Sequence, residues 1–272
     1  MPLAIKGINV ILNERQKKIV KTLLSMETAT VDDLSTMFKV STVTIRSDLN
    51  QLAESGEVIR SRGGARIADE RVRQEYTFGT RRRLKAPQKI AIGESAAKML
   101  EPNDSILLDA SSTAVAVAQA IKRQKLAFEV TVVTTGIWTA LELLGDPNIQ
   151  VVLMGGFVRN TTGSITGDIT KENLDRFNFN KVFLGAWGLD LIHGLTDSHM
   201  MEIELKRDII KRSQDTVIVI DSSKFGRIGL APFATCDQIQ KIITDISAPN
   251  EIISQLQRKG IDIILADPRK VN

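Results

Sequence analysis

Four short segments carry residue types that bind anions. They are 109–113, 135–136, 155–156 and 221–224. The first combines an aspartate with three hydroxyl residues, the two in the middle contain glycine, and the last places a lysine after two serines. Hydroxyl groups, free N–H groups at a helix start, close backbone approach at glycine and a lysine charge all suit a phosphate. Each segment alone also fits an ordinary helix cap or turn. Taken together they predict one anion site, with expected contacts at Asp109, Ser111, Ser112, Thr113, Thr135, Gly136, Gly155, Gly156 and Lys224.

The elements that must position these residues alternate between strands and helices. Alternation of this kind is typical of a mostly parallel sheet flanked by helices. Ligands of such sheets bind beyond the carboxyl ends of the strands, where the four segments fall. Strands are predicted at 105–108, 130–134, 151–154, 181–184, 216–220, 241–244 and 262–265, and helices at 89–100, 114–124, 137–144, 201–213 and 250–259.

A second group of residues, before position 68, has the layout of a DNA-binding domain. Apolar residues at helical spacing predict a helix over 13–26, and Thr30 with Asp33 predicts a capping box that starts a second helix. Ser41 is expected to cap a third helix that runs to about residue 55, followed by a hairpin of strands at 57–61 and 65–67. Three helices followed by a hairpin predict a winged helix-turn-helix.

The third predicted helix buries Ile45, Leu49 and Leu52 in one stripe, so its other side chains face outward. The first turns of such a helix read bases in the major groove, and arginines on the hairpin meet the backbone or the minor groove. The alternative is a small helical bundle that contacts other proteins. The expected DNA contacts are Ser41, Thr42, Val43, Thr44, Arg46, Ser47, Arg60 and Arg62.

Length, charge and cysteine content limit the classes of protein. The 272 residues suggest about two domains. With Cys236 as the one cysteine, an internal disulfide is excluded, and so is a zinc site of four cysteines or of two cysteines and two histidines. Between Val58 and Lys89, ten Lys and Arg face three acidic residues, a net of +7 against +4 for the whole chain. This basic segment suits nucleic acid, although a solvated linker without a partner has the same composition. No apolar stretch is long enough for a membrane span, and a cytoplasmic protein without cofactor or metal is expected.

The two groups of residues together resemble the DeoR family of bacterial transcription regulators. That family usually reads V-S-x-x-T-I-R-R-D-L and then R-x-H-G-G-A, whereas this chain has Ser47 for the second arginine and Arg62 for the histidine. In its first sensor loop the family usually reads D-x-G-T/S-T, and Ser111 replaces that glycine. The similarity covers nearly the whole chain from about Leu12, through segments 40–49, 60–65, 109–113, 155–156, 185–190, 194–196 and 221–226.

This resemblance implies an α/β chain in which a winged helix-turn-helix is followed by a larger sensor domain similar to ribose-5-phosphate isomerase. The expected limits are 12–67 for the DNA-binding domain (helix-turn-helix motif about 29–48), 68–88 for a basic linker, and 89–272 for an effector-sensing and oligomerisation domain. The expected partners are operator double-stranded DNA, a phosphorylated sugar and further copies of the chain as a dimer or tetramer, with no membrane. The implied function is repression of a carbohydrate-use operon, released by the sugar phosphate. Asp190, Asp197 and Lys224 either contact sugar hydroxyls or brace loops.

Isomerases of that fold use an acid motif D-G-A-D and a lysine in a K-G-G-G turn. This chain has Leu184 and Trp187 at the two ends of the first motif and His193 in the turn, with no evident carboxylate partner for the histidine. Glu202, Glu204, Lys206 and Arg207 fit the exposed, ion-paired face of a helix. The chain is therefore expected not to be an enzyme. Two alternatives are an isomerase-type enzyme with a vestigial DNA-binding head, and an architectural DNA binder whose C-terminal domain only oligomerises.

Overall fold

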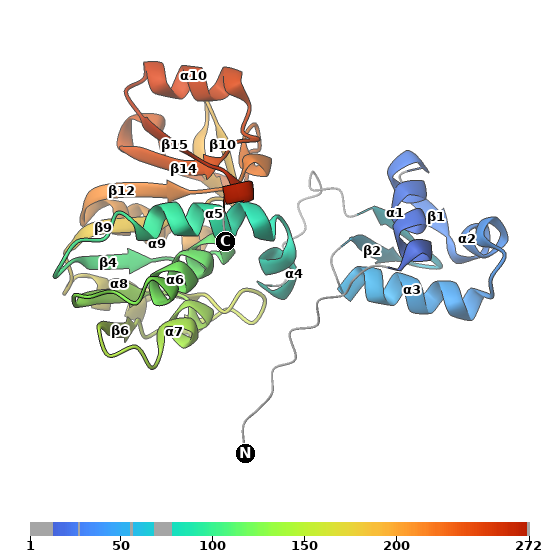
Figure 1. The fold of residues 1–272 in the computed structure, drawn as a ribbon, viewed down its shortest axis with the longest axis horizontal. Helices are drawn as coiled ribbons and strands as arrows, with labels where there is room; N and C mark the ends of the chain where they lie inside the picture. Colours follow the sequence, from blue (N-terminus) through green and yellow to red (C-terminus); the bar gives the residue numbers. More distant parts are fainter. Residues whose placement is uncertain (1–12, 27, 55–56, 68–77, 271–272) are drawn as a thin grey trace. The chain divides into compact units, whose positions relative to one another are not determined.

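The computed structural model describes residues 13–26, 28–54, 57–67 and 78–270, and these fall into two compact units (Figure 1). The described part of the first unit ends at residue 67, and that of the second unit begins at residue 78. Within the described ranges, no helix combines the length and the apolar character needed to cross a bilayer.

The first unit has three helices and a three-stranded sheet. The predicted capping box is confirmed, because Thr30 Oγ1 accepts a hydrogen bond from the Asp33 amide and Asp33 Oδ2 accepts one from the Thr30 amide, both at 3.1 Å. The buried stripe of Ile45, Leu49 and Leu52 is confirmed too, since none of the three side chains is exposed. The elements are α1 (Glu14–Met26), β1 (Thr28–Thr30), α2 (Val31–Phe38), α3 (Thr42–Glu54), β2 (Val58–Ser61) and β3 (Gly64–Ile67).

The hairpin of β2 and β3 belongs to a larger sheet than the sequence indicated. The short strand β1 was not predicted, and it pairs with β3, so the strand order is β1-β3-β2. Gly64 makes this approach possible, because a Cβ on it would lie 2.3 Å from the Ala29 carbonyl oxygen. The wing is thereby held to the helical part of the unit through main-chain hydrogen bonds.

The second unit is built on a seven-stranded sheet in the order β15-β14-β12-β9-β4-β5-β6, with every neighbouring pair parallel. All seven predicted strands are present, with ends that differ by up to three residues. They are β4 (Ser105–Leu108), β5 (Val130–Thr134), β6 (Ile149–Leu153), β9 (Phe179–Leu184), β12 (Ser213–Val219), β14 (Lys241–Asp245) and β15 (Asp262–Ala266).

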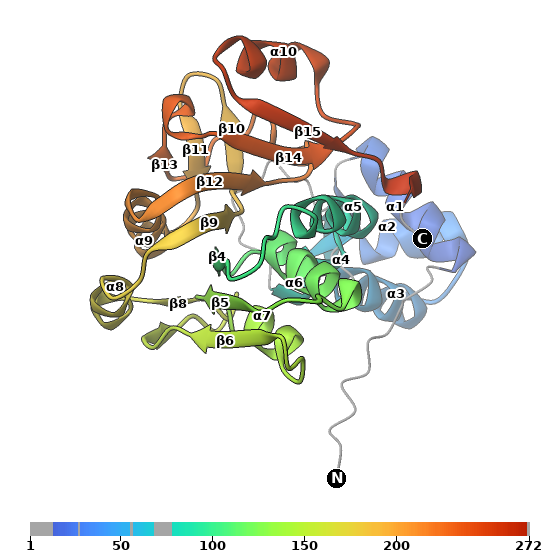
Figure 2. The same ribbon diagram turned by 60° about the vertical axis from the view of Figure 1, so that its left-hand side comes forward.

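Helices cover both faces of this sheet, because its strands are apolar on both sides. Side chains alternate along β12: Val217 and Val219 pack in the core under α5 and α6, whereas Ile218 and Ile220 pack in the core under α9. Figure 2 shows α5 and α6 on one side of the sheet and α9 on the other. The helices are α5 (Ala86–Ala97), α6 (Ser112–Gln124), α7 (Ile137–Leu143), α8 (Asp168–Leu174), α9 (Met200–Lys211) and α10 (Asn250–Arg258).

The chain changes direction between β4 and β9, which is the switch point of the sheet. From β4 the chain proceeds through β5 to β6 on one side, and β9, β12, β14 and β15 continue on the other. A crevice forms at such a point, beyond the carboxyl ends of the two strands. The sequence did not predict α8 or two antiparallel additions, the pair β7 (Phe157–Val158) and β8 (Ile165–Thr166) and the sheet of β10 (Gly188–Asp190), β11 (Gly194–Asp197) and β13 (Ala231–Ala234).

The predicted linker, 68–88, is helical in its described part. Residues 68–77 lie outside the described residues, but α4 (Phe78–Arg83) and the start of α5 fall inside the predicted linker range. Lys89 is buried and its ammonium donates to the carbonyls of Arg81 (2.5 Å) and Leu84 (2.6 Å), which fixes α4 against α5. The second unit therefore begins before residue 89.

Candidate functional site

Helix α3 presents the predicted DNA-binding residues at its amino end. Ser41 caps it, since Ser41 Oγ accepts a hydrogen bond from the Thr44 amide at 3.2 Å. Val43 is 71% exposed, and Arg46 and Ser47 are exposed as well, while Thr42 and Thr44 are half-buried. The first turn thus offers hydroxyl, methyl and guanidinium groups on one free surface, which is what base-edge contacts need.

A buried ion pair that the sequence reasoning missed holds α3 in place. Asp48 is 3% exposed, and Arg15 donates to it twice, from Nε to Oδ2 at 2.5 Å and from Nη2 to Oδ1 at 3.2 Å. The signal was present, because Asp48 lies three residues after Ile45 and four before Leu52, on the buried stripe of the helix. A charge at such a position needs a partner. Arg15 therefore fixes α1 to the back of α3.

The two arginines predicted to contact DNA from the wing, the hairpin of β2 and β3, differ in their contacts. Arg62 is exposed at the turn, next to Gly63, whose φ of +83° favours glycine. Arg60 is also exposed, but its Nη1 donates to the Gly64 carbonyl at 3.0 Å across the hairpin. Arg62 is consequently the better placed of the two to reach a DNA phosphate.

A small pocket of about 10 Å³ lies at the switch point of the second unit. Asp109 follows β4 and meets Gly185, which follows β9: Asp109 Oδ2 accepts a hydrogen bond from the Gly185 amide at 2.9 Å. Thr135 lines the pocket from the loop after β5. The full lining is Asp109, Ala110, Thr135, Ser164, Ile165, Thr166, Glu202, Leu205, Lys206 and Ile209.

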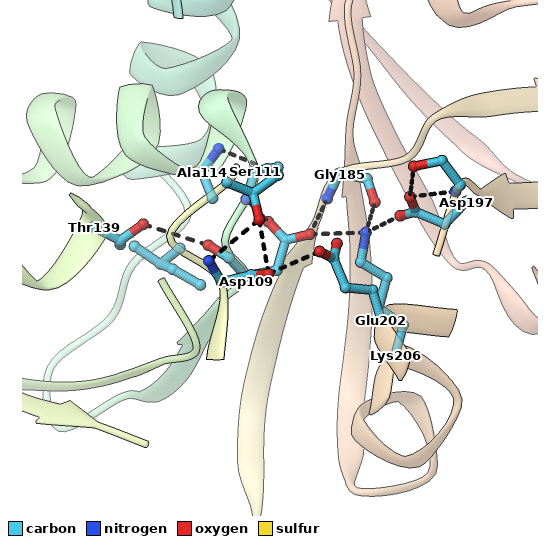
Figure 3. Close-up of polar contacts among 12 residues, drawn as sticks. Asp109, Ser111, Ala114, Thr139, Gly185, Asp197, Glu202 and Lys206 are labelled. Carbon is cyan, nitrogen blue, oxygen red and sulfur yellow. Dashed lines mark hydrogen bonds and ion pairs between the residues drawn. The ribbon is translucent and has the colours of Figure 1, made fainter. Parts of the chain in front are cut away.

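Lys206 from α9 is the central charge of this pocket, and Figure 3 shows it between two aspartates. Its ammonium lies 2.6 Å from Asp197 Oδ2 and 3.2 Å from Asp109 Oδ2, and donates to the Gly185 carbonyl at 2.8 Å. Burial by itself lowers the pKa of Lys206, but the carboxylates of Asp197, Asp109 and Glu202 together raise it above its usual value. Burial likewise raises the pKa of Asp197, yet the nearby Lys206 charge lowers it overall. Both groups are therefore charged at neutral pH.

This arrangement corrects the prediction that Lys206 and Glu202 lie on an exposed helix face. Lys206 is 6% exposed, and the side chain of Glu202 is 12% exposed. Glu202 forms an ion pair with Arg159 and accepts a hydrogen bond from Ser164 Oγ at 2.8 Å. The signal for Lys206 was its spacing, because it lies three residues from both Ile203 and Ile209, which are buried. Glu202 carried a similar signal, because it lies three residues before Leu205 and seven before Ile209, which are buried.

The predicted residues after β4 and β5 lie next to this pocket. Ser111 caps α6, since its Oγ accepts a hydrogen bond from the Ala114 amide at 3.0 Å, and Asp109 Oδ1 accepts one from the Ser111 amide at 2.9 Å. Ser112 and Thr113 form the first turn of α6 and are buried. Gly136 lies against Ala110, because a Cβ on it would be 2.9 Å from the Ala110 Cα. The two loops are therefore adjacent, as strand order requires.

Of the predicted effector residues, only Asp109 and Thr135 line the pocket itself, and two further predicted groups have other contacts. Gly156 has a φ of +150°, and a Cβ on it would lie 2.0 Å from Thr170 Oγ1, so this glycine accommodates α8. Its neighbour Gly155 accepts a hydrogen bond from the same hydroxyl at 2.8 Å. Lys224 lies over the Trp187 ring, with its ammonium 5.8 Å from the ring centroid.

Asp190 braces its own loop, and it also corrects the expectation that His193 has no carboxylate partner. Asp190 Oδ1 accepts hydrogen bonds from the Ile192 and His193 amides at 3.0 and 2.9 Å, and lies 2.8 Å from His193 Nδ1. The backbone and side-chain hydrogen bonds from His193 lower the pKa of Asp190. His193 itself is exposed.

The cysteine, Cys236, lies apart from the pocket lining. It is buried, and burial raises the pKa of its thiol.

Two family models match this chain, one in each unit. A DeoR-like helix-turn-helix domain matches residues 15–71, and a DeoR C terminal sensor domain matches residues 84–246. The HTH-type transcriptional regulator GolR of Listeria innocua is 34% identical over 255 residues, which cover 93% of this chain and 98% of that protein. The glycerol-3-phosphate regulon repressor of Escherichia coli K12 is 27% identical over 252 residues, with 93% and 98% covered. Ribose 5 phosphate isomerase A from Neisseria gonorrhoeae superposes with a TM-score of 0.37 at 15% identity, over 55% of this chain and 56% of that one.

Proposed function

The chain belongs to the DeoR family of transcriptional regulators, and on that premise we propose that it represses a carbohydrate-use operon and leaves its operator when a phosphorylated sugar binds. One relative is named as the repressor of a regulon for a phosphorylated compound, glycerol 3-phosphate, which supports both parts of the proposal. We propose 12–67 as the DNA-binding domain and place the start of the effector domain at residue 78, where Phe78 is already buried in the second unit.

The observation that supports sequence-specific DNA binding is the capped, outward-facing first turn of α3. Ser41 and Thr44 fix the helix start, and Arg46 extends from the exposed face, where it can reach a guanine edge or a phosphate. The Arg15–Asp48 ion pair keeps that face rigid. Arg62 is proposed to contact the DNA backbone from the wing.

For the effector we propose that the first turn of α6 binds the phosphate and that the pocket carboxylates bind the sugar hydroxyls. The amides and hydroxyls of Ser112 and Thr113 lie at the positive end of the α6 dipole. Asp109 and Glu202 can accept hydrogen bonds from a polyol, and the Lys206 ammonium lies 3.2 Å from Asp109 Oδ2 in the same pocket. The cavity of about 10 Å³ has room for about one water molecule, so a sugar phosphate enters only when the side chains that line it move apart.

We propose that this pocket binds its ligand without converting it. The relatives compared above are named regulators, which supports this reading. Lys206 is held as a cation by Asp109 and Asp197, so it has no free electron pair with which to take a proton. Leu184 and Trp187 stand where the isomerase motif has acids. A turnover assay with ribose, fructose and glucosamine phosphates tests this, and conversion that disappears in a Glu202→Gln protein would establish an enzyme instead.

We further propose that the repressor works as a homo-oligomer, because helix-turn-helix proteins commonly bind two half-sites about one helical turn apart. Sedimentation of the full chain, alone and with DNA, tests this. A monomer that binds a single half-site with full affinity would contradict it.

The DNA-binding part is tested by selecting duplexes from a random-sequence library with the full chain. We expect an enriched sequence with two related half-sites, and affinity that falls steeply as salt rises, because phosphate contacts release counterions. Equal affinity for the selected and scrambled duplexes would contradict the proposal and favour an architectural DNA binder.

The effector part is tested by calorimetry of the full chain with glycerol 3-phosphate, ribose 5-phosphate, fructose 6-phosphate and glucosamine 6-phosphate. The double variant Ser112→Ala with Thr113→Ala is expected to weaken binding by on the order of several hundredfold, because each hydrogen bond to a charged phosphate is worth about 1.5–3 kcal/mol. Ser111→Ala is the matched control, since it removes the α6 cap and lowers the melting temperature instead. Unchanged sugar-phosphate affinity in the double variant would place the phosphate elsewhere.

A further inference from the structure

The first described residue of the second unit, Phe78, is a buried aromatic residue with several contacts. Residues 68–77 join the two units covalently, and Phe78 is the first described residue after them. It is 5% exposed, and its ring stacks on Trp138 with the centroids 5.3 Å apart and the planes 15° apart. Its amide donates to the Thr161 carbonyl at 2.9 Å. The start of α4 is thus attached to α7 and to the segment 159–165.

The same segment 159–165 forms one wall of the effector pocket. Ser164 and Ile165 line the pocket, and Ser164 Oγ donates to Glu202 at 2.8 Å. Arg159 forms the ion pair with Glu202 at the start of the segment. One short loop therefore carries both the contacts of Glu202 and the anchor of Phe78.

Rigid contacts connect the two sides of this loop. A Cβ on Gly163 would lie 2.5 Å from Trp138 Nε1, so the indole rests directly on the loop backbone. The Ile137 amide donates to the Gly163 carbonyl at 3.1 Å, and the Ile165 amide donates to the Thr135 carbonyl at 2.7 Å. Because the loop is bonded both to α7 and to the pocket, it moves as one piece with them rather than bending between them.

We propose that segment 159–165 couples the effector pocket to α4, with Glu202 as the input and the Phe78–Trp138 stack as the output. A sugar hydroxyl that binds Glu202 competes with Ser164 and Arg159 for the same carboxylate. The loop then takes a second position, which moves the Phe78 ring and the start of α4. A ligand shifts such an equilibrium only by its differential contacts in the two positions, and the Glu202 contacts supply that difference. This inference rests on the proposed function, because it assigns how the same pocket is read.

The first test needs neither effector nor DNA. Glu202→Gln removes the charge that pairs with Arg159 and weakens the acceptor for Ser164, so we expect faster hydrogen exchange at the Phe78 amide, by on the order of tenfold, a typical coupling between two sites. Glu204→Gln is the matched control on the same helix, because the Glu204 side chain is 46% exposed and pairs with Lys171 only at the surface. Exchange at Phe78 that is the same in both variants as in the wild type overturns the proposal.

The second test asks whether Phe78 transmits the signal. Phe78→Leu loses the stack on Trp138, and Phe177→Leu loses a stack of similar size on Phe179, which lies at the amino end of the central strand β9. Both proteins are expected to bind the selected duplex, and whichever of the four compounds the wild type binds, as the wild type does. Only Phe78→Leu is expected to stay on DNA when the sugar phosphate is added, with release reduced by about tenfold.

The outcomes separate the coupling from the proposed function. If Glu202→Gln alters exchange at Phe78 but none of the four compounds binds, the coupling stands and the proposed effector class is wrong. If a compound binds and releases DNA equally from Phe78→Leu and from Phe177→Leu, the effector class stands and the coupling through Phe78 is refuted.

Discussion

Replacing Lys206 with methionine removes the ammonium that Asp109 and Asp197 share, while it keeps most of the volume of the side chain. The two carboxylates are 2% and 7% exposed, so water cannot take over the role of the lysine. Removal of one partner from a buried ion pair costs about 3–5 kcal/mol, because the remaining charge is left without compensation. In a unit of this size about 1 kcal/mol lowers the melting temperature by roughly 2–4 °C. We therefore expect the second unit of Lys206→Met to melt roughly 6–20 °C lower at pH 7.

The pH dependence of this loss has a definite sign. In the wild type the pKa of Asp197 is lowered, so its contribution to stability is present above the ordinary aspartate pKa and is lost only as pH falls through the lower folded value. The pKa of Lys206 is raised, so its contribution is complete below the ordinary lysine pKa. Without Lys206, burial raises the pKa of Asp197, and its protonation removes an uncompensated buried charge. The difference in melting temperature between variant and wild type should therefore narrow from pH 7 to pH 5.

Calorimetric melting curves of wild type, Lys206→Met and Lys211→Met measure this effect. Lys211 lies on the same helix, but its side chain is 74% exposed and pairs with Asp208 at the surface, so its loss should stay within about 0.5 kcal/mol. Adding Asp197→Asn to Lys206→Met should recover part of the lost stability of the second unit, because it removes one buried carboxylate that has lost its compensating charge. A Lys206→Met protein that melts within about 2 °C of the wild type at pH 7 would refute the argument that Lys206 compensates these aspartates.

Three further predictions concern the DNA-binding unit. If Arg46 reads a base, Arg46→Ala should weaken binding to the selected duplex by about 1–3 kcal/mol. If Arg46 binds a phosphate, the dependence of log affinity on log salt concentration should become shallower by about one. The melting temperature should not change, and titrations at two salt concentrations distinguish the two roles. Asp48→Ala should lower the stability of the first unit by about 1.5–3 kcal/mol, because Arg15 loses its charged partner, and denaturant unfolding at pH 7 measures it. Hydrogen bonds from the Thr30 hydroxyl and amide lower the pKa of Asp33, so its contribution to the stability of the first unit is lost as pH falls below about 4. Asp33→Asn should remove this part of the acid sensitivity, and melting curves from pH 6 to pH 3 measure it.

The sequence by itself determined the local features of both units. The Thr30–Asp33 capping box, the Ser41 cap and the buried stripe of α3 depend on residues three or four apart, and such pairs meet in any helix. Apolar runs likewise determined the strands of the parallel sheet, because strands buried on both faces have to be apolar throughout. The sequence did not predict the short strand β1, because β1 forms only by pairing with β3, which lies more than thirty residues further along the chain.

Only the tertiary structure decided which charged residues meet. Lys206 was expected at the surface, since charges on helices are mostly solvated, yet the order of the strands brings Asp109 after β4 and Asp197 on β11 to the same ammonium. Glu202 and Arg159 are likewise far apart in the sequence and become partners only when α9 lies against the loop before β8. Local spacing determines which face of a helix a side chain occupies, whereas the burial of a charge and its compensation depend on every element that packs around it.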